Sequence, residues 1–168
     1  TKDENAVAAL SVIMPVFIIM NAVASLFGIG GSSLIARYLG RKDPDKAKHV
    51  FAFSLWGSVA ASIIYSLVIL IFAKPIIYAV GGSDATYEYI YNYALITMII
   101  GSIPTILNNV FGHLVRAVGA SKEASIGMGL GGVLNIILDP LFMFVLLPKG
   151  NEVLGAGLAT MFSNVAST

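Results

Sequence analysis

Long segments without Asp, Glu, Lys or Arg constrain the fold of this chain more than any other feature. Crossing a bilayer takes about 20 helical, mostly apolar residues. The uncharged segments of at least this length are 5–36, 50–73 and 89–115. A fourth segment, 124–148, is interrupted only by Asp139, and a fifth, 153–168, is uncharged but shorter than one crossing. This pattern predicts a chain that folds within a membrane.

The composition supports a membrane protein. Hydrophobic residues make up 57% of the chain and charged residues 11%, whereas soluble domains carry about a quarter charged residues. The net charge of +1 provides no basic surface, so we expect no nucleic-acid partner. Without cysteine, neither a disulfide framework nor a thiolate metal site can form. The predicted fold class is all-α, a polytopic transmembrane helical bundle surrounded by lipid.

The short connections between the apolar segments suit helix ends. Asp43 followed by Pro44 is typical of a helix start, because the carboxylate accepts from free N–H groups and proline needs none. With such boundaries the predicted membrane helices are about 6–39, 46–73, 85–116 and 122–147, with the start of a further helix at 153–168. Pro15 and Pro104 lie inside apolar segments, where each is predicted to kink its helix.

The basic residues predict the orientation in the membrane. One side receives Arg37, Arg41, Lys42, Lys46, Lys48, Arg116 and Lys122, and the other receives Lys2, Lys74 and Lys149. Because cytoplasmic loops are rich in Lys and Arg, loops 40–48 and 117–122 are predicted to be cytoplasmic. Thr1 would then lie outside, so we expect at least one helix upstream of it.

Tyrosines cluster around the predicted outer loop at 81–84. They are Tyr78, Tyr87, Tyr89, Tyr91 and Tyr93. We interpret them as an interfacial aromatic belt, with a cation-binding cage as the alternative.

Asp139 is the main candidate for a functional residue. It is the one acidic residue inside the apolar segments, and counting ~1.5 Å per residue from Ile126 places it ~20 Å into the membrane. An unpaired ionised carboxylate there is costly, which makes its presence a functional hypothesis. Asn135, one turn earlier, adds an amide to the same face, and Pro140 has no N–H for the carbonyl of Ile136.

This group of oxygens could hold a small hard cation such as Na⁺ at Asp139 and Asn135, or its carboxyl could bind and release a proton. The alternative is a structural Asp139 that is hydrogen-bonded to a neighbouring helix and never titrates. Gly28 with Ser32, and Gly127 with Gly131, have the spacing of small residues at close helix contacts.

Several motifs resemble the multidrug and toxic compound extrusion (MATE) family. They are LIARYLG at 34–40 with Lys46-Ala47, LVRAVG at 114–119, NIILDPLF at 135–142 and GAGLAT at 155–160. They follow one another in the family's order and spacing, and the motif at 135–142 is the most specific. In the family they belong to helices two to six.

The resemblance implies part of a twelve-helix, two-lobe transporter. The chain would supply helices two to five and the start of helix six in the N-terminal lobe, with the first helix and the C-terminal lobe absent. Asn135 and Asp139 would lie in the lobe's cation or proton site, with Thr160 as a third member and Pro140 as a kink beside it.

The implied function is a secondary active multidrug efflux antiporter that exchanges Na⁺ or H⁺ for amphipathic, often cationic drugs. Such a transporter would not be an enzyme, would have no cofactor beyond the coupling ion, and would lie in the bacterial inner (plasma) membrane. Its partners would be the drug and the rest of the same transporter.

Two alternatives come from other functional classes. A flippase of lipid-linked precursors should hold a pyrophosphate with basic residues deep in its spans, and this chain has none there. A membrane-embedded prenyltransferase-like enzyme could begin with the spacing of Asn135 and Asp139 but needs further acidic residues for Mg²⁺, and position 143 is Met.

Overall fold

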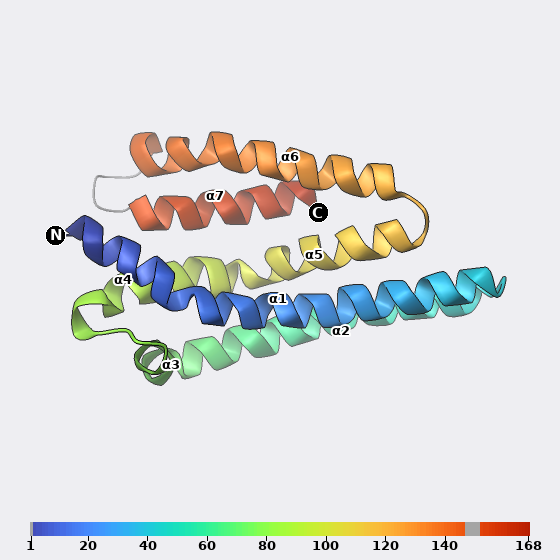
Figure 1. Cartoon of the computed structure of the whole chain (residues 1–168), viewed down its shortest axis with the longest axis horizontal. Helices are drawn as coiled ribbons and strands as arrows, with labels where there is room; N and C mark the ends of the chain where they lie inside the picture. Colours follow the sequence, from blue (N-terminus) through green and yellow to red (C-terminus); the bar gives the residue numbers. More distant parts are fainter. Residues whose placement is uncertain (1, 147–151) are drawn as a thin grey trace.

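The structure is a computed structural model that describes residues 2–146 and 152–168, in which every regular element is a helix (Figure 1). The all-α prediction is therefore confirmed. Three helices are long and apolar enough to cross a membrane: Ser11–Gly40, Pro44–Ile71 and Ser121–Leu146. A bent pair, Asp84–Ile100 with Ser102–Ala117, makes a fourth if it counts as one span.

The first two helices form an antiparallel hairpin. Helix α1 (Lys2–Gly40) runs through Pro15 without a break, and α2 (Pro44–Ile71) follows a tight turn. The carboxylate of Asp43 accepts from the backbone N–H of Lys46 at 3.2 Å, as expected for a cap. The turn at 118–120, between α5 and α6, lies at the same end of the bundle, on the right of Figure 1.

The predicted helix 85–116 is divided in the structure. Helix α4 (Asp84–Ala94) continues into the π-helix η1 (Leu95–Ile100), and α5 (Ser102–Ala117) leaves at an angle of 50°. The break falls at Gly101 and not at Pro104. Pro104 lies in the first turn of α5, where proline is tolerated because an N–H at that position would have no helical partner. A Cβ at Gly101 would lie 2.7 Å from the carbonyl oxygen of Ile96, so the bend requires glycine.

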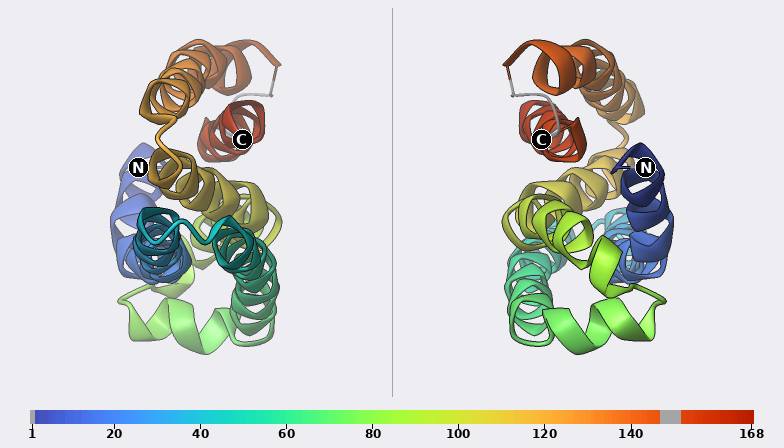
Figure 2. Two further views of the ribbon diagram at one scale, coloured as in Figure 1. Left: turned by 90° about the vertical axis from the view of Figure 1, so that its right-hand side faces the viewer. Right: turned by 90° about the vertical axis from the view of Figure 1, so that its left-hand side faces the viewer.

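The end of the bundle opposite the α1–α2 turn also departs from the simple hairpin. The predicted helix 46–73 ends at Ile71, and a short helix α3 (Ala73–Ala79) lies across the end of the bundle (Figure 2). Tyr78 donates to the carboxylate of Asp84, which raises the pKa of the phenol, and the rings of Tyr78, Tyr87 and Tyr91 stack in series. Lys149 and the last residue of the predicted helix 122–147 lie outside the described residues.

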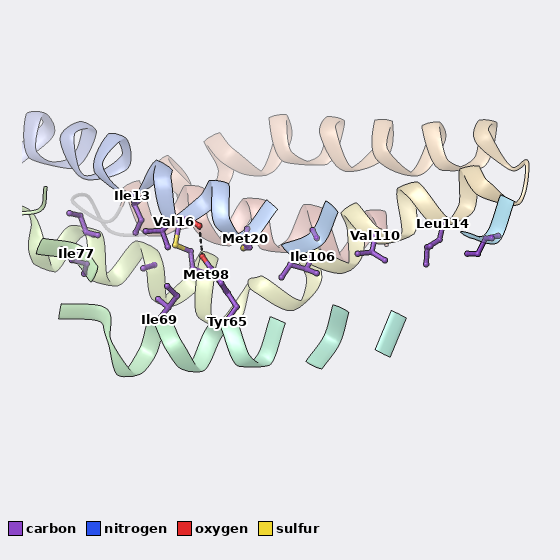
Figure 3. Packing of buried hydrophobic residues seen from close by; sticks show 14 of the residues in the cluster. Ile13, Val16, Met20, Tyr65, Ile69, Ile77, Met98, Ile106, Val110 and Leu114 are labelled. Carbon is purple, nitrogen blue, oxygen red and sulfur yellow. Dashed lines mark hydrogen bonds between the residues drawn. The ribbon is translucent and has the colours of Figure 1, made fainter. Parts of the chain in front are cut away.

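The hydrophobic core lies where α1, α2, α4 and α5 meet. Its fully buried side chains include Met20, Ile106 and Leu114, and the buried hydroxyl of Tyr65 donates to the carbonyl oxygen of Val16 at 3.1 Å (Figure 3). Small residues allow the helices to approach: a Cβ at Gly28 would lie 2.8 Å from the His113 ring. This is the close contact predicted for a small residue at position 28.

The last two helices form a separate pair on one side of the bundle. Helix α6 (Ser121–Pro140) continues into the π-helix η2 (Leu141–Leu146), and α7 (Glu152–Ser167) packs along it (Figure 2). Along Ser121–Leu146 the only buried residues are Ala124 and Gly131. Both helices of this pair contact α5, and α7 also contacts α4 and η1.

Candidate functional site

The site begins with two polar side chains on one face of α6. The amide nitrogen of Asn135 donates to Oδ1 of Asp139 at 3.4 Å, and both residues are half-buried. This contact is longer than the usual 2.7–3.2 Å of an N–H to oxygen bond. The structure therefore brings the two predicted residues together but leaves most of the carboxylate's acceptor capacity unused.

Pro140 acts on the backbone next to this pair. The helix does not break there, since Ser121–Leu146 is a single span. Instead, the residues directly after the proline form the π-helix η2. A π-helical turn often marks a functional site, because it widens the helix and displaces carbonyl groups from their α-helical partners. The predicted kink is thus a local change of helix type beside Asp139.

Thr160 comes from α7, which packs along α6 through two close contacts. A Cβ at Gly155 would lie 2.9 Å from the backbone of Met143, and one at Gly131 would lie 2.7 Å from Cβ of Ser167. Between these two contacts the antiparallel register places Thr160 at the level of Asn135 to Asp139. The hydroxyl of Thr160 donates to the carbonyl oxygen of Ala156 at 2.9 Å and makes no hydrogen bond to Asn135 or Asp139.

Tyr93 of α4 is half-buried, and the charge of Asp139 acts on its phenol group. Its place in the predicted interfacial belt stays a prediction. Gly157 of α7 packs against Thr97, whose hydroxyl donates to the backbone carbonyl of Tyr93 at 2.7 Å. Spacing alone does not relate Tyr93 to Asp139, because the two residues belong to different helices, α4 and α6.

A second polar group lies further along α5 and α7. Asn108 donates to Asn164 at 2.9 Å, and Asn164 donates to the hydroxyl of Thr105 at 2.8 Å. Beside them, Oδ1 of Asn109 is buried and has no hydrogen-bond partner. Neutral amides and hydroxyls thus line the space between the core and α7.

The donor set limits which ions this region could hold. Among the described residues, no three His, Cys, Asp or Glu side chains come together as a metal-binding group. Asp139 contributes one carboxylate, Asn135 an amide oxygen beside it, and Thr160 a hydroxyl at its level. One negative charge with neutral oxygen donors suits a monovalent cation or a proton, whereas Ca²⁺ takes six to eight oxygens, usually from several carboxylates.

Comparison with known proteins gives consistent matches. The family model described as MatE matches residues 2–141. The multidrug export protein MepA of Staphylococcus aureus (strain NCTC 8325 / PS 47) is 37% identical over 166 residues, which cover 99% of this chain and 36% of that protein. The chain therefore spans about a third of the length of this relative.

Two solved structures resemble the fold closely. One is the inward-facing conformation of a multidrug resistance MATE family transporter of the MOP superfamily, with a TM-score of 0.89 and 32% identity. The match covers 97% of this chain and 36% of that one. An outward-facing conformation of such a transporter gives a TM-score of 0.87 at 32% identity, over 95% of this chain and 35% of that one.

Proposed function

This chain belongs to the MatE family, and from that premise we propose that it carries the ion-coupling site of a secondary active multidrug efflux antiporter. The antiporter exchanges Na⁺ or H⁺ for amphipathic, often cationic drugs. The observation that supports this most directly is the position of Asp139, half-buried within a helix long and apolar enough to span a membrane, next to Asn135.

In this proposal the cation or proton binds at Asp139. Asn135, Tyr93 and Thr160 supply neutral oxygens around it, and the weak contact between Asn135 and Asp139 leaves the carboxylate available. Binding neutralises a charge that is costly within the membrane. It can drive transport only if the ion binds the two access states with different affinity.

The movement itself is assigned to whole lobes and not to a refolding of this one. The chain is almost equally similar to an inward-facing and an outward-facing transporter, with TM-scores of 0.89 and 0.87. This similarity favours rotation of a nearly rigid lobe against the rest of the transporter. The π-helix after Pro140 is the segment through which ion binding would alter the packing of α6 against α7.

The proposal also implies which larger molecule the chain belongs to and in which membrane it lies. It is part of a longer transporter whose remaining helices complete the ion site and the drug pathway, consistent with the 36% of the relative that it spans. We assign it to the bacterial inner (plasma) membrane with the turns at 41–43 and 118–120 on the cytoplasmic side, because most of the basic residues gather there.

The test is drug efflux from proteoliposomes that contain the complete transporter, under a Na⁺ gradient alone or a H⁺ gradient alone. We expect one gradient to drive efflux and Asp139→Asn to abolish that stimulation while keeping the thermal stability. Glu123→Gln, at the exposed start of α6, is the matched control and should leave efflux unchanged. Normal gradient-driven efflux by Asp139→Asn, or efflux under neither gradient, would refute the proposal.

A further inference from the structure

An apolar groove runs along the outside of the α1–α2 hairpin. It has a volume of about 600 Å³ and is lined by Leu26, Gly30 and Leu34 of α1 and by Val50 and Phe53 of α2. Leu26 and Phe53 are 70% and 72% exposed. The volume falls within the range of about 300–1,000 Å³ typical of small-molecule sites.

The groove points toward a cluster of basic side chains at the α1–α2 turn. Arg37 follows Leu34 by three residues, which places it on the same face of α1, and Arg41 lies in the turn directly after that helix. Both are exposed, and neither forms an ion pair within the described residues. Two uncompensated positive charges therefore stand at the open end of an apolar groove.

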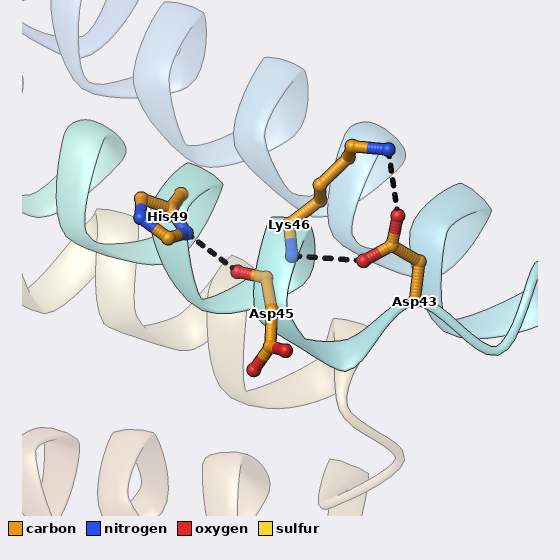
Figure 4. Close-up of polar contacts among 4 residues, drawn as sticks. All are labelled: Asp43, Asp45, Lys46 and His49. Atoms are coloured by element: carbon orange, nitrogen blue, oxygen red, sulfur yellow. Dashed lines mark hydrogen bonds and ion pairs between the residues drawn. The ribbon is translucent and has the colours of Figure 1, made fainter.

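The facing end of α2 adds a third positive charge in a fixed position. Lys46 precedes Val50 by one helical turn, so it lies on the groove side of α2. Its ammonium group is 2.8 Å from the carboxylate of Asp43 (Figure 4). It is also 5.9 Å from the centre of the Tyr38 ring. The hydrogen bond from the Lys46 side chain keeps the pKa of Asp43 below its ordinary value, so this pair stays ionised.

The turn itself keeps a positive charge at a conformational cost. Lys42 has a φ of 57°, in the left-handed region, where glycine or asparagine is usual. The backbone N–H of Asp43 donates to the carbonyl oxygen of Tyr38 at 3.0 Å. This hydrogen bond is typical of a helix end in which the residue before the donor is left-handed and usually glycine. Strain that is retained at such a position is a reason to look for a function of the side chain.

We propose that the α1–α2 hairpin binds one anionic phospholipid of the cytoplasmic leaflet, with an acyl chain in the groove and the phosphate at Arg37 and Arg41. The dimensions agree: from Arg41 to Leu26 is about 22 Å along α1, and one leaflet contributes about 15 Å of hydrocarbon beneath the headgroups. Clusters of Lys and Arg at the cytoplasmic boundary attract anionic headgroups. The proposal uses the orientation assigned above and is independent of which ion couples transport.

The headgroup half of the site is tested by native mass spectrometry of the complete transporter, titrated with phosphatidylglycerol or phosphatidylcholine. Each basic residue near an anionic membrane surface contributes about fivefold to binding, so Arg37→Gln with Arg41→Gln should weaken phosphatidylglycerol retention about 25-fold. Lys48→Gln is the matched control, because Lys48 lines a different pocket on the other side of α2. It should retain phosphatidylglycerol like the parent, and no variant should change phosphatidylcholine retention.

The acyl half is tested by filling the groove without disturbing the fold. A Cβ at Gly30 meets no atom within 4 Å, and the same is true at Gly129 on α6. Gly30→Leu should therefore fold normally and lower phosphatidylglycerol retention at least fivefold, whereas Gly129→Leu should have no effect. The thermal stability of both variants shows that folding is preserved.

Three outcomes would overturn the proposal. Equal loss in the Lys48→Gln control would show nonspecific attraction between the protein and the negative headgroup. Unchanged retention in Gly30→Leu would show that the groove holds no acyl chain, because the rest of the transporter covers it or because lipid does not enter. Competition by millimolar inorganic phosphate or glycerophosphoglycerol, equal to that by the lipid, would assign the arginines to a free phosphate ligand. Drug efflux serves as a separate readout, so loss of lipid retention with normal ion-driven efflux supports this site without testing the coupling site.

Discussion

Helices α1 and α2 are more deeply buried than α6. In the most apolar part of each span, 28% of the residues of α1 and of α2 are buried, compared with 6% of those of Ser121–Leu146. The first region holds the core residues and its polar groups are satisfied locally, as when Ser58 and Ser62 donate to carbonyls three residues earlier at 2.8 Å. The second region contains Asp139, whose side chain makes one long hydrogen bond among the described residues. The first region is therefore held by close packing, whereas the second carries the polar side chains of the candidate site.

This difference implies that stability and coupling can be separated by substitution. Changes in the packed region should alter the free energy of unfolding and leave the response to an ion gradient intact. Changes around Asp139 should do the reverse. The following predictions test that separation in the complete transporter.

The largest effect is expected from adding a side chain to a packed helix contact. A Cβ at Gly31 would lie 2.2 Å from Oγ and 2.9 Å from Cβ of Ser54, whereas one at Gly132 of α6 meets nothing within 4 Å. Gly31→Leu should destabilise the protein by about 3 kcal/mol, at the upper end of the usual cost of overpacking. Thermal unfolding in detergent measures this, with Gly132→Leu as the matched control. Equal stability of the two variants would mean that α1 and α2 are not in close contact.

The next test compares Tyr65 of the packed region with Tyr93 of α4. Tyr65→Phe removes the bond to Val16 and should lower the free energy of unfolding by about 1 kcal/mol while efflux stays normal. Tyr93→Phe removes a phenol oxygen that the proposal places around the bound ion, and it should reduce ion-driven efflux about tenfold, equivalent to about 1.4 kcal/mol, with little change in stability. Unfolding and proteoliposome efflux are measured for both variants. If both variants lose stability and neither loses efflux, Tyr93 belongs to the packed region.

The smallest effect is expected at the turn, and its sign is opposite. Lys42→Gly relieves a left-handed residue and should raise the free energy of unfolding by up to about 1 kcal/mol. Lys48→Gly, at an exposed position inside α2, is the control and should lower it by roughly the helix-propensity difference of about 0.5–1 kcal/mol. Differential scanning fluorimetry can compare the two. A lower melting temperature for Lys42→Gly would show that the lysine side chain itself stabilises the turn.

Much of the fold could be predicted from local features of the sequence. The uncharged segments locate the membrane helices, and Asp43 with Pro44 marks the start of α2 to within two residues. The break before α5 was placed near Pro104 but lies at Gly101, because the preceding π-helix was not visible in the residue pattern. The short helix α3 was also missed, since its residues continue the apolar run of α2.

The candidate site was partly predictable for the same reason. Asn135 and Asp139 are one helical turn apart on a single helix, so their proximity follows from helix geometry. Tyr93 and Thr160 come from other helices, and their relation to Asp139 depends on packing. Tyr78, Tyr87 and Tyr91 stack in series, and the assignment of this tyrosine cluster to an aromatic belt stays a prediction.

By itself, the sequence determined that this chain forms membrane helices with one carboxylate deep among them, because hydrocarbon tolerates only apolar side chains and internally bonded backbone. Tertiary structure alone decided which residues from distant segments surround that carboxylate and where a groove meets the basic turn. Such contacts depend on the angles and registers at which helices pack, and these are set by small residues such as Gly31 and Gly155 that allow two backbones to approach.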